Sequence, residues 1–190
     1  ISKTGGETFA ALYLAKSAGS VQLLSGLNVT GPASGNALEM NGTTDVLDLN
    51  GNTLTLAGTA GGTDANGTIK GSATSNLVVN GTGAIGTLRF TSGSQTLNNF
   101  TLNRTSSGAL TLGTPLTVNG ALTLTNGVMA TGANTLTLAP AGTLSRTNGY
   151  VAGSFKKRVA AGSPTVTFEI GSAASYLPVT LAFSSVTVAG

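Results

Sequence analysis

The stretch LTLGTPLTVNGALTLTNGVMATGANTLTL, residues 110–138, decides the fold that we expect for this chain. Apolar residues recur there at every second position, in the pairs Leu110/Leu112, Leu116/Val118, Leu122/Leu124 and Leu136/Leu138. A period of two places one side of a strand in a core and the other side in water. Thr fills most positions between the apolar ones, and Asn-Gly or Gly-Ala ends the runs, which is typical of short strands joined by tight turns.

No single strand of this kind can bury its Leu side chains alone, so each strand must pack on the next. The sequence therefore predicts an all-β fold, a parallel β-solenoid (β-helix) with a C-terminal antiparallel β cap or partial β-sandwich. If a coil takes roughly 20 residues, about seven coils fit before Arg146, and at about 4.8 Å per coil they make a rod roughly 35 Å long.

The composition narrows the classes of function. Of 190 residues 28 are Gly, only 8% are charged, and both Cys and His are absent. His is the commonest general base and the commonest metal ligand, so we expect no enzyme activity, no cofactor and no metal. No window of 18 apolar residues exists, so we expect no membrane span.

Charge is unevenly divided along the chain. Residues 1–70 carry three Lys against five carboxylates, a net −2, whereas residues 71–190 carry six Lys and Arg against one Glu, a net +5. Ends of opposite sign are compatible with head-to-tail stacking of copies, although weak exposed charges of this kind often have no role.

An internal repeat supports the solenoid. Residues 7–31 align with residues 95–120, and residues 46–58 align with residues 128–140. Leu12 then matches Phe100, and Leu14 matches Leu102. We infer a solenoid over 1–147 that contains two copies of a multi-coil unit, at about 1–85 and 86–147.

The sequence pattern changes in residues 148–190, where the expected strands are longer and contain aromatic residues. Pro164 and Pro178 should lie at strand ends or edges, because proline lacks the amide that a sheet needs. We expect antiparallel strands that cover the open end of the solenoid. Since the chain begins at Ile1 without Met and ends at Gly190 directly after an alternating run, we expect it to be part of something longer.

Three blocks of the sequence resemble the repeat regions of large secreted and cell-surface β-solenoid proteins of Bacteroidota, which are exported by type IX secretion. They are ISKTGGETFAALYLAKSAGSVQL, LTVNGALTLTNGVMATGANTLTL and GYVAGSFKKRVAAGSPTVTFEIGSAASYLPVTLAF. The resemblance implies a secreted or cell-surface location, an adhesive or structural role and solenoids that alternate with β-sandwich modules. It supplies no catalytic residues.

Acidic residues offer two candidate sites. Asp45 and Asp48 lie near Glu39, and some parallel β-helix enzymes use such clusters on polysaccharides. Residues three apart on a strand face opposite sides, so we expect Asp45 and Asp48 to be solvated turn residues. Gly61–Gly67 (GGTDANG) is similar to a single imperfect copy of a calcium-binding repeat, or is simply a surface loop.

The only basic run, Phe155–Val159, contains Lys156, Lys157 and Arg158. These side chains are candidates for contact with a polyanion such as an acidic polysaccharide; alternatively they guard a strand edge against unwanted pairing. No aromatic stacking platform accompanies them, so we expect no nucleic-acid partner.

Thr-x-Thr pairs are candidates for a water-ordering, ice-binding face; otherwise Thr is simply the default outward residue of a polar sheet. The pairs are Thr53/Thr55, Thr123/Thr125 and Thr135/Thr137.

The sequence thus favours an extracellular structural or adhesive module, either a stiff spacer in a surface protein or a subunit of a fibre assembled through strand pairing. The expected partners are other copies or neighbouring modules, end to end, and surface glycans. The alternative is a carbohydrate-binding module or polysaccharide-active β-helix, and ice binding is the minor alternative.

Overall fold

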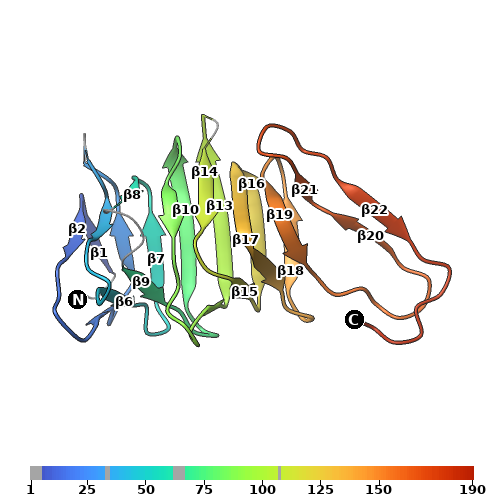
Figure 1. Ribbon diagram of the computed structural model, residues 1–190, viewed down its shortest axis with the longest axis horizontal. Helices are drawn as coiled ribbons and strands as arrows, with labels where there is room; N and C mark the ends of the chain where they lie inside the picture. The colour runs from blue at the N-terminus through green and yellow to red at the C-terminus, as the bar shows by residue number, and fades with distance from the viewer. Residues whose placement is uncertain (1–5, 33–34, 62–66, 107) are drawn as a thin grey trace.

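The computed structural model describes residues 6–32, 35–61, 67–106 and 108–190. Every element within these ranges is a β-strand, and the strands stack side by side along one axis from the N-terminal to the C-terminal end (Figure 1). The strands described along the stack pair in parallel, and among the sheets in these ranges only the one at the C-terminal end is antiparallel. The expected parallel β-solenoid with an antiparallel C-terminal cap is therefore confirmed.

Each coil contributes a strand to each of three faces. Face A is a 7-stranded sheet of β1 (Glu7–Phe9), β4 (Leu27–Val29), β7 (Thr53–Leu56), β10 (Asn76–Thr82), β13 (Asn99–Thr105), β16 (Ala121–Asn126) and β18 (Thr143–Arg146). Its seven strands give the seven coils expected from the sequence.

Face B begins with β2 (Leu12–Leu14), β5 (Leu38–Met40) and β8 (Ala60–Gly61). The amide of Ala60 donates to the carbonyl of Ile85 at 2.7 Å, which joins these strands to the next coil. Face B then continues through β11 (Gly86–Leu88), β14 (Ala109–Leu112), the first half of β17 (Val128–Leu138), the first half of β19 (Tyr150–Lys156) and β21 (Ile170–Gly171).

Face C consists of β3 (Val21–Gln22), β6 (Val46–Asp48), β9 (Thr68–Lys70), β12 (Thr96–Leu97), β15 (Leu116–Val118) and the second halves of β17 and β19. Strand β17 serves two faces because its pairing with β19 breaks between Ala130 and Thr135. Gly132 has a φ of 57° inside this break, a backbone conformation that glycine adopts without strain.

The coils stack in register. The aligned inward positions of face A are Glu7, Leu27, Leu54, Leu77, Phe100, Leu122 and Leu144, so successive coils take 20, 27, 23, 23, 22 and 22 residues. Both residues of each of the four apolar pairs between Leu110 and Leu138 are buried in one continuous hydrophobic core. The period of two therefore predicted which side chains fill this core.

The internal alignment matched the wrong faces. Leu12 lies in β2 on face B, whereas its match Phe100 lies in β13 on face A. Leu54 of face A was likewise matched to Leu136 of face C. All three faces carry the same alternation of apolar and polar residues, so a self-alignment cannot tell a whole coil from one third of a coil.

Parallel stacking continues beyond residue 147, the end expected for the solenoid. β19 pairs with β17, and β21 pairs with β19. The C-terminal ribbon then follows as the antiparallel pair β20 (Thr165–Phe168) and β22 (Val179–Ala182), at the opposite end of the molecule from β1 (Figure 1). Pro164 and Pro178 stand immediately before these two strands, as the sequence predicted.

Candidate functional site

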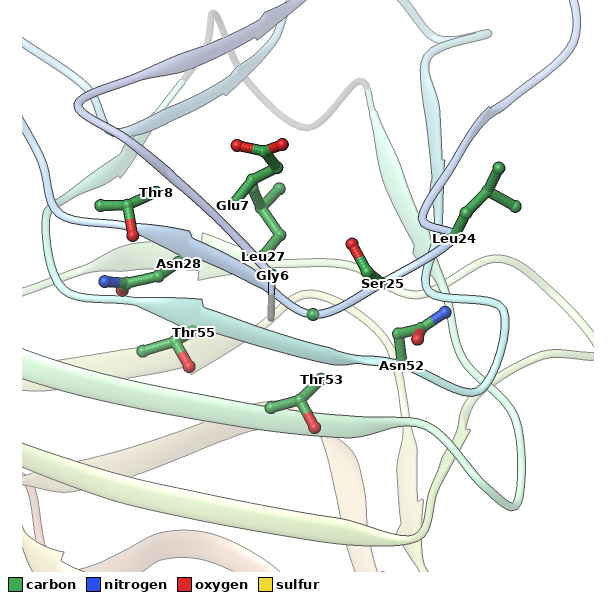
Figure 2. A pocket seen from close by; sticks show the side chains of 11 residues that line it. Gly6, Glu7, Thr8, Leu24, Ser25, Leu27, Asn28, Asn52, Thr53 and Thr55 are labelled. Atoms are coloured by element: carbon green, nitrogen blue, oxygen red, sulfur yellow. The ribbon is translucent and has the colours of Figure 1, made fainter. Parts of the chain in front are cut away.

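A hollow of about 540 Å³ lies at the N-terminal end, over the first coils of face A. Figure 2 shows Glu7 beside Leu27 on neighbouring strands, and Leu24 at the rim next to Ser25. The rest of the lining is mostly hydroxyls and amides, and within the described residues the Glu7 carboxylate has no hydrogen bond or ion pair. A single carboxylate among hydroxyls and amides can bind polar groups, but it lacks the second carboxylate that glycoside hydrolysis uses.

Four of the six candidate Thr residues lie on face A and the other two do not. The outward file of face A is formed, coil after coil, by Thr8, Asn28, Thr55, Val78, Thr101, Thr123 and Ser145. Thr53 lies in the same strand as Thr55, and Thr125 follows Thr123 at a register break. Thr135 and Thr137 lie on face C, so the three pairs do not form one surface.

Asp45 and Asp48 are buried, contrary to the expectation of solvated turn residues. Asp45 accepts hydrogen bonds from the amides of Lys16, at 2.6 Å, and Gly42, at 2.8 Å. Asp48 accepts from the amide of Asn50 at 2.9 Å and pairs with the ammonium group of Lys70 at 2.8 Å. The two carboxylates share no partner, so they hold turns and adjacent coils rather than one reacting group.

The basic run is divided by the structure. Lys157 is mostly buried, donates to the carbonyl of Thr167 and pairs with Glu169, with Nζ and Oε2 2.9 Å apart. Its ammonium group also lies 5.3 Å from the centre of the Phe168 ring. Lys156 and Arg158 are exposed. Of the three basic side chains in this run, only those of Lys156 and Arg158 are exposed to solvent.

Arg104 is the largest fully buried side chain, at 1% exposed, and the sequence analysis did not single it out. It donates to carbonyls in two other coils: Ala57 and Gly58 in one, Asn80, Thr82 and Gly83 in the next. Burial lowers the pKa of Arg104, yet a guanidinium stays protonated at any physiological pH. The burial of Arg104 could have been predicted from the strand alternation. Arg104 follows Phe100 and Leu102 at every second position of one strand, so its side chain points to the same side as theirs.

A ladder of asparagines runs along the corner after face A. Asn126 donates to the side-chain oxygen of Asn103 at 2.8 Å, and Asn148 donates to that of Asn126 at 3.0 Å. Asn80 holds the aligned position one coil earlier, and its side-chain oxygen is buried with no hydrogen-bond partner among the described residues. The spacing of these residues, 22 or 23, equals the coil length and could have predicted the ladder.

Metal sites and membrane-spanning helices can be assessed only in the parts of the chain that the structure describes. No group of three or more Asp and Glu side chains gathers to hold a metal ion in those parts. The core of the candidate calcium loop, residues 62–66 of Gly61–Gly67, lies outside them. No helix there is long and apolar enough to cross a membrane.

The fold and these contacts define the class of the protein: a seven-coil parallel β-solenoid, held by a Leu-rich core and buried polar ladders and closed by a C-terminal ribbon. No family model matches the sequence, and comparisons with curated proteins and with solved structures find no match either.

Proposed function

We propose that this chain is an extracellular structural module, a stiff spacer of a surface protein or a subunit of a fibre. The observation that carries the proposal is the unbroken face A, in which seven strands are hydrogen-bonded in parallel and fix the direction of one rod. Since each coil pairs with the next along three faces, bending the rod would require hydrogen bonds of several strands to break together.

Buried polar side chains add to the stiffness. Arg104 connects three successive coils, and the asparagine ladder connects Asn103, Asn126 and Asn148 of three successive coils through two hydrogen bonds. Such side chains would be left without partners if two coils moved apart, which costs about 1–3 kcal/mol for each group. Buried polar side chains that join successive coils resist separation of the coils, and this property suits a module that keeps a fixed length.

The alternative of a carbohydrate-binding module has less support from the side chains. Sugar rings stack on exposed aromatic residues, and in the described ranges Tyr13 is the one aromatic side chain classed as exposed. Tyr13 lies in β2 of face B, outside the residues that line the hollow over Glu7.

The proposal is tested on intact cells of the organism that encodes the chain. Antibodies raised against the folded chain should label the cell surface or secreted material, and protease added outside should remove the signal. Labelling that requires permeabilised cells would contradict the proposal. A glycan array distinguishes the structural module from the carbohydrate-binding module. A spacer should give no signal on the array, and a carbohydrate-binding module should bind selected glycans.

A further inference from the structure

Exposed large apolar side chains are confined to the two ends of the molecule. Tyr13 and Leu24 lie in the first coil, and Leu24 is 59% exposed. The others, Leu177, Val179, Leu181 and Val188, all lie in the C-terminal segment. Between these ends the described part of the chain exposes no large apolar side chain, so the sides of the rod are polar and its ends are not.

The apolar residues of the C-terminal ribbon form one row. Val179 and Leu181 alternate on β22, so they project to one side of the ribbon, together with Phe168 and Val166 opposite them on β20, and the exposed Leu177 lies two residues before this strand. Phe168 packs edge-on against Phe155 of the solenoid, but Leu181 is still 41% exposed. β22 pairs with β20 on one side only in the described ranges, and a two-stranded ribbon is marginally stable alone.

The first coil offers a matching surface. β1 pairs with β4 and with no other described strand, so its outer edge is free within those ranges. Beside this edge, the hollow over Glu7 has Leu24 at its rim (Figure 2). Glu7 holds a position that is apolar in the next six coils, so the end of the core carries a carboxylate that has no ion-pair partner within the described residues.

Charge at the other end has the opposite sign. Lys156 and Arg158 are exposed there, and Glu169, the acidic residue of that region, is already paired with Lys157. An apolar, basic surface at one end is complementary to a hollow with an apolar rim and one carboxylate at the other end, and neither surface is complementary to itself. Contacts between such unlike surfaces build open chains rather than closed dimers.

We infer that a second copy of this chain occupies the hollow of the first coil: its C-terminal ribbon lays Leu177, Val179 and Leu181 against Leu24, and its basic run faces Glu7. The inference rests on the proposed structural role and gives it a partner and a direction. Copies then join head to tail, with β22 of one copy beside the free edge of the next.

The test uses two variants of the full chain, each blocked at one end, in analytical ultracentrifugation. Leu24→Asp removes the acceptor surface, and Leu181→Asp removes the donor surface; both positions are exposed, so folding should be retained and is checked by circular dichroism. The wild type should form concentration-dependent chains, each variant alone should be monomeric, and an equimolar mixture should form dimers and nothing larger. Thr101→Asp, on the side of the rod, is the control and should assemble as the wild type does.

Charge provides a second readout that does not depend on the apolar variants. Glu7→Lys and Arg158→Glu should each weaken association, by about tenfold, and the double variant should recover most of it. A wild type that stays monomeric at millimolar concentration, a mixture that stays monomeric, or a closed dimer would overturn the inference. The surface location and stiffness of the single rod are measured separately, so they would survive that result.

Discussion

Lys157 and Glu169 form an ion pair at the junction between the solenoid and its C-terminal ribbon, with Nζ and Oε2 2.9 Å apart. Both side chains are mostly shielded from water, at 13% and 15% exposed. Lys157 follows β19, the last long strand of the stack, and Glu169 stands between β20 and β21. The pair therefore connects the covering ribbon to the body that it covers.

Breaking this ion pair should loosen the ribbon. Glu169→Gln leaves the Lys157 ammonium group shielded without its counter-charge, and we expect a loss of about 2 kcal/mol, between the values for exposed and buried pairs. Hydrogen exchange of the β20 and β22 amides should accelerate, while exchange in β10 and β13 stays unchanged. Lys70→Met, which removes the half-exposed partner of Asp48, is the comparison and should leave the ribbon amides unaffected. Equal acceleration in both variants would contradict this role.

Arg104→Met should destabilise the middle of the solenoid. Methionine fills a similar volume but leaves the carbonyls of Gly83, Asn80 and their neighbours without a donor, so we expect a loss of about 3 kcal/mol or more. Urea unfolding followed by circular dichroism measures the change. Arg89→Met is the matched control because the Arg89 side chain makes no hydrogen bond or ion pair within the described residues, and its backbone carbonyl keeps its bond from the amide of Ile69. Similar stabilities for the two variants would show that the buried guanidinium contributes little.

The asparagine ladder predicts a difference between two Asn-Gly sites. Asn126→Ala removes one bond that Asn126 donates to Asn103 and one that it accepts from Asn148, and should cost about 1–2 kcal/mol. Asn119→Ala, at another Asn-Gly, loses no side-chain hydrogen bond of the described structure and should cost less than half as much. If thermal unfolding shifts equally for both, the ladder is not a stabilising feature.

Two glycines separate backbone strain from steric clash. Gly81 has a φ of 96°, and a Cβ placed on it would lie 2.0 Å from the carbonyl oxygen of Ala57. Gly83 has a φ of 69°, but a Cβ there would meet nothing within 4 Å. Gly83→Ala should therefore cost about 1–2 kcal/mol, from the left-handed backbone alone. Gly81→Ala should cost clearly more in the same urea titration, and equal costs would mean that the coils separate easily.

The strand alternation and the turn signals were enough to predict the fold class, the coil number and the apolar core from the sequence. Leu110, Leu112, Leu116 and Val118 were assigned to the core from their period alone, and all are buried. The coil boundaries were missed because three faces with the same alternation make a shift by one face look like a repeat. Leu12 and Phe100 are the clearest example.

The polar interior could not be predicted by the same rule. Arg104 and Asp45 are buried because backbone groups of other coils satisfy them, and those coils are defined only once the chain has folded. Rules for single residues assign arginine and aspartate to the surface. The apolar surfaces at the two ends could not be predicted either, because Leu24 and Leu181 look like ordinary core residues in an alternating sequence, yet both are exposed.

The distance between the two ends of face A tests the central claim, a stiff rod of stacked coils, most directly. Thr8 and Ser145 belong to one outward file and are separated by six coil-to-coil steps, about 29 Å at about 4.8 Å per step. The chain has no Cys, so Thr8→Cys and Ser145→Cys allow specific spin labelling for electron–electron double resonance. A narrow distribution centred near that distance, after allowance for the label linkers, is the predicted result. A broad distribution, or one centred far from it, would contradict the rod.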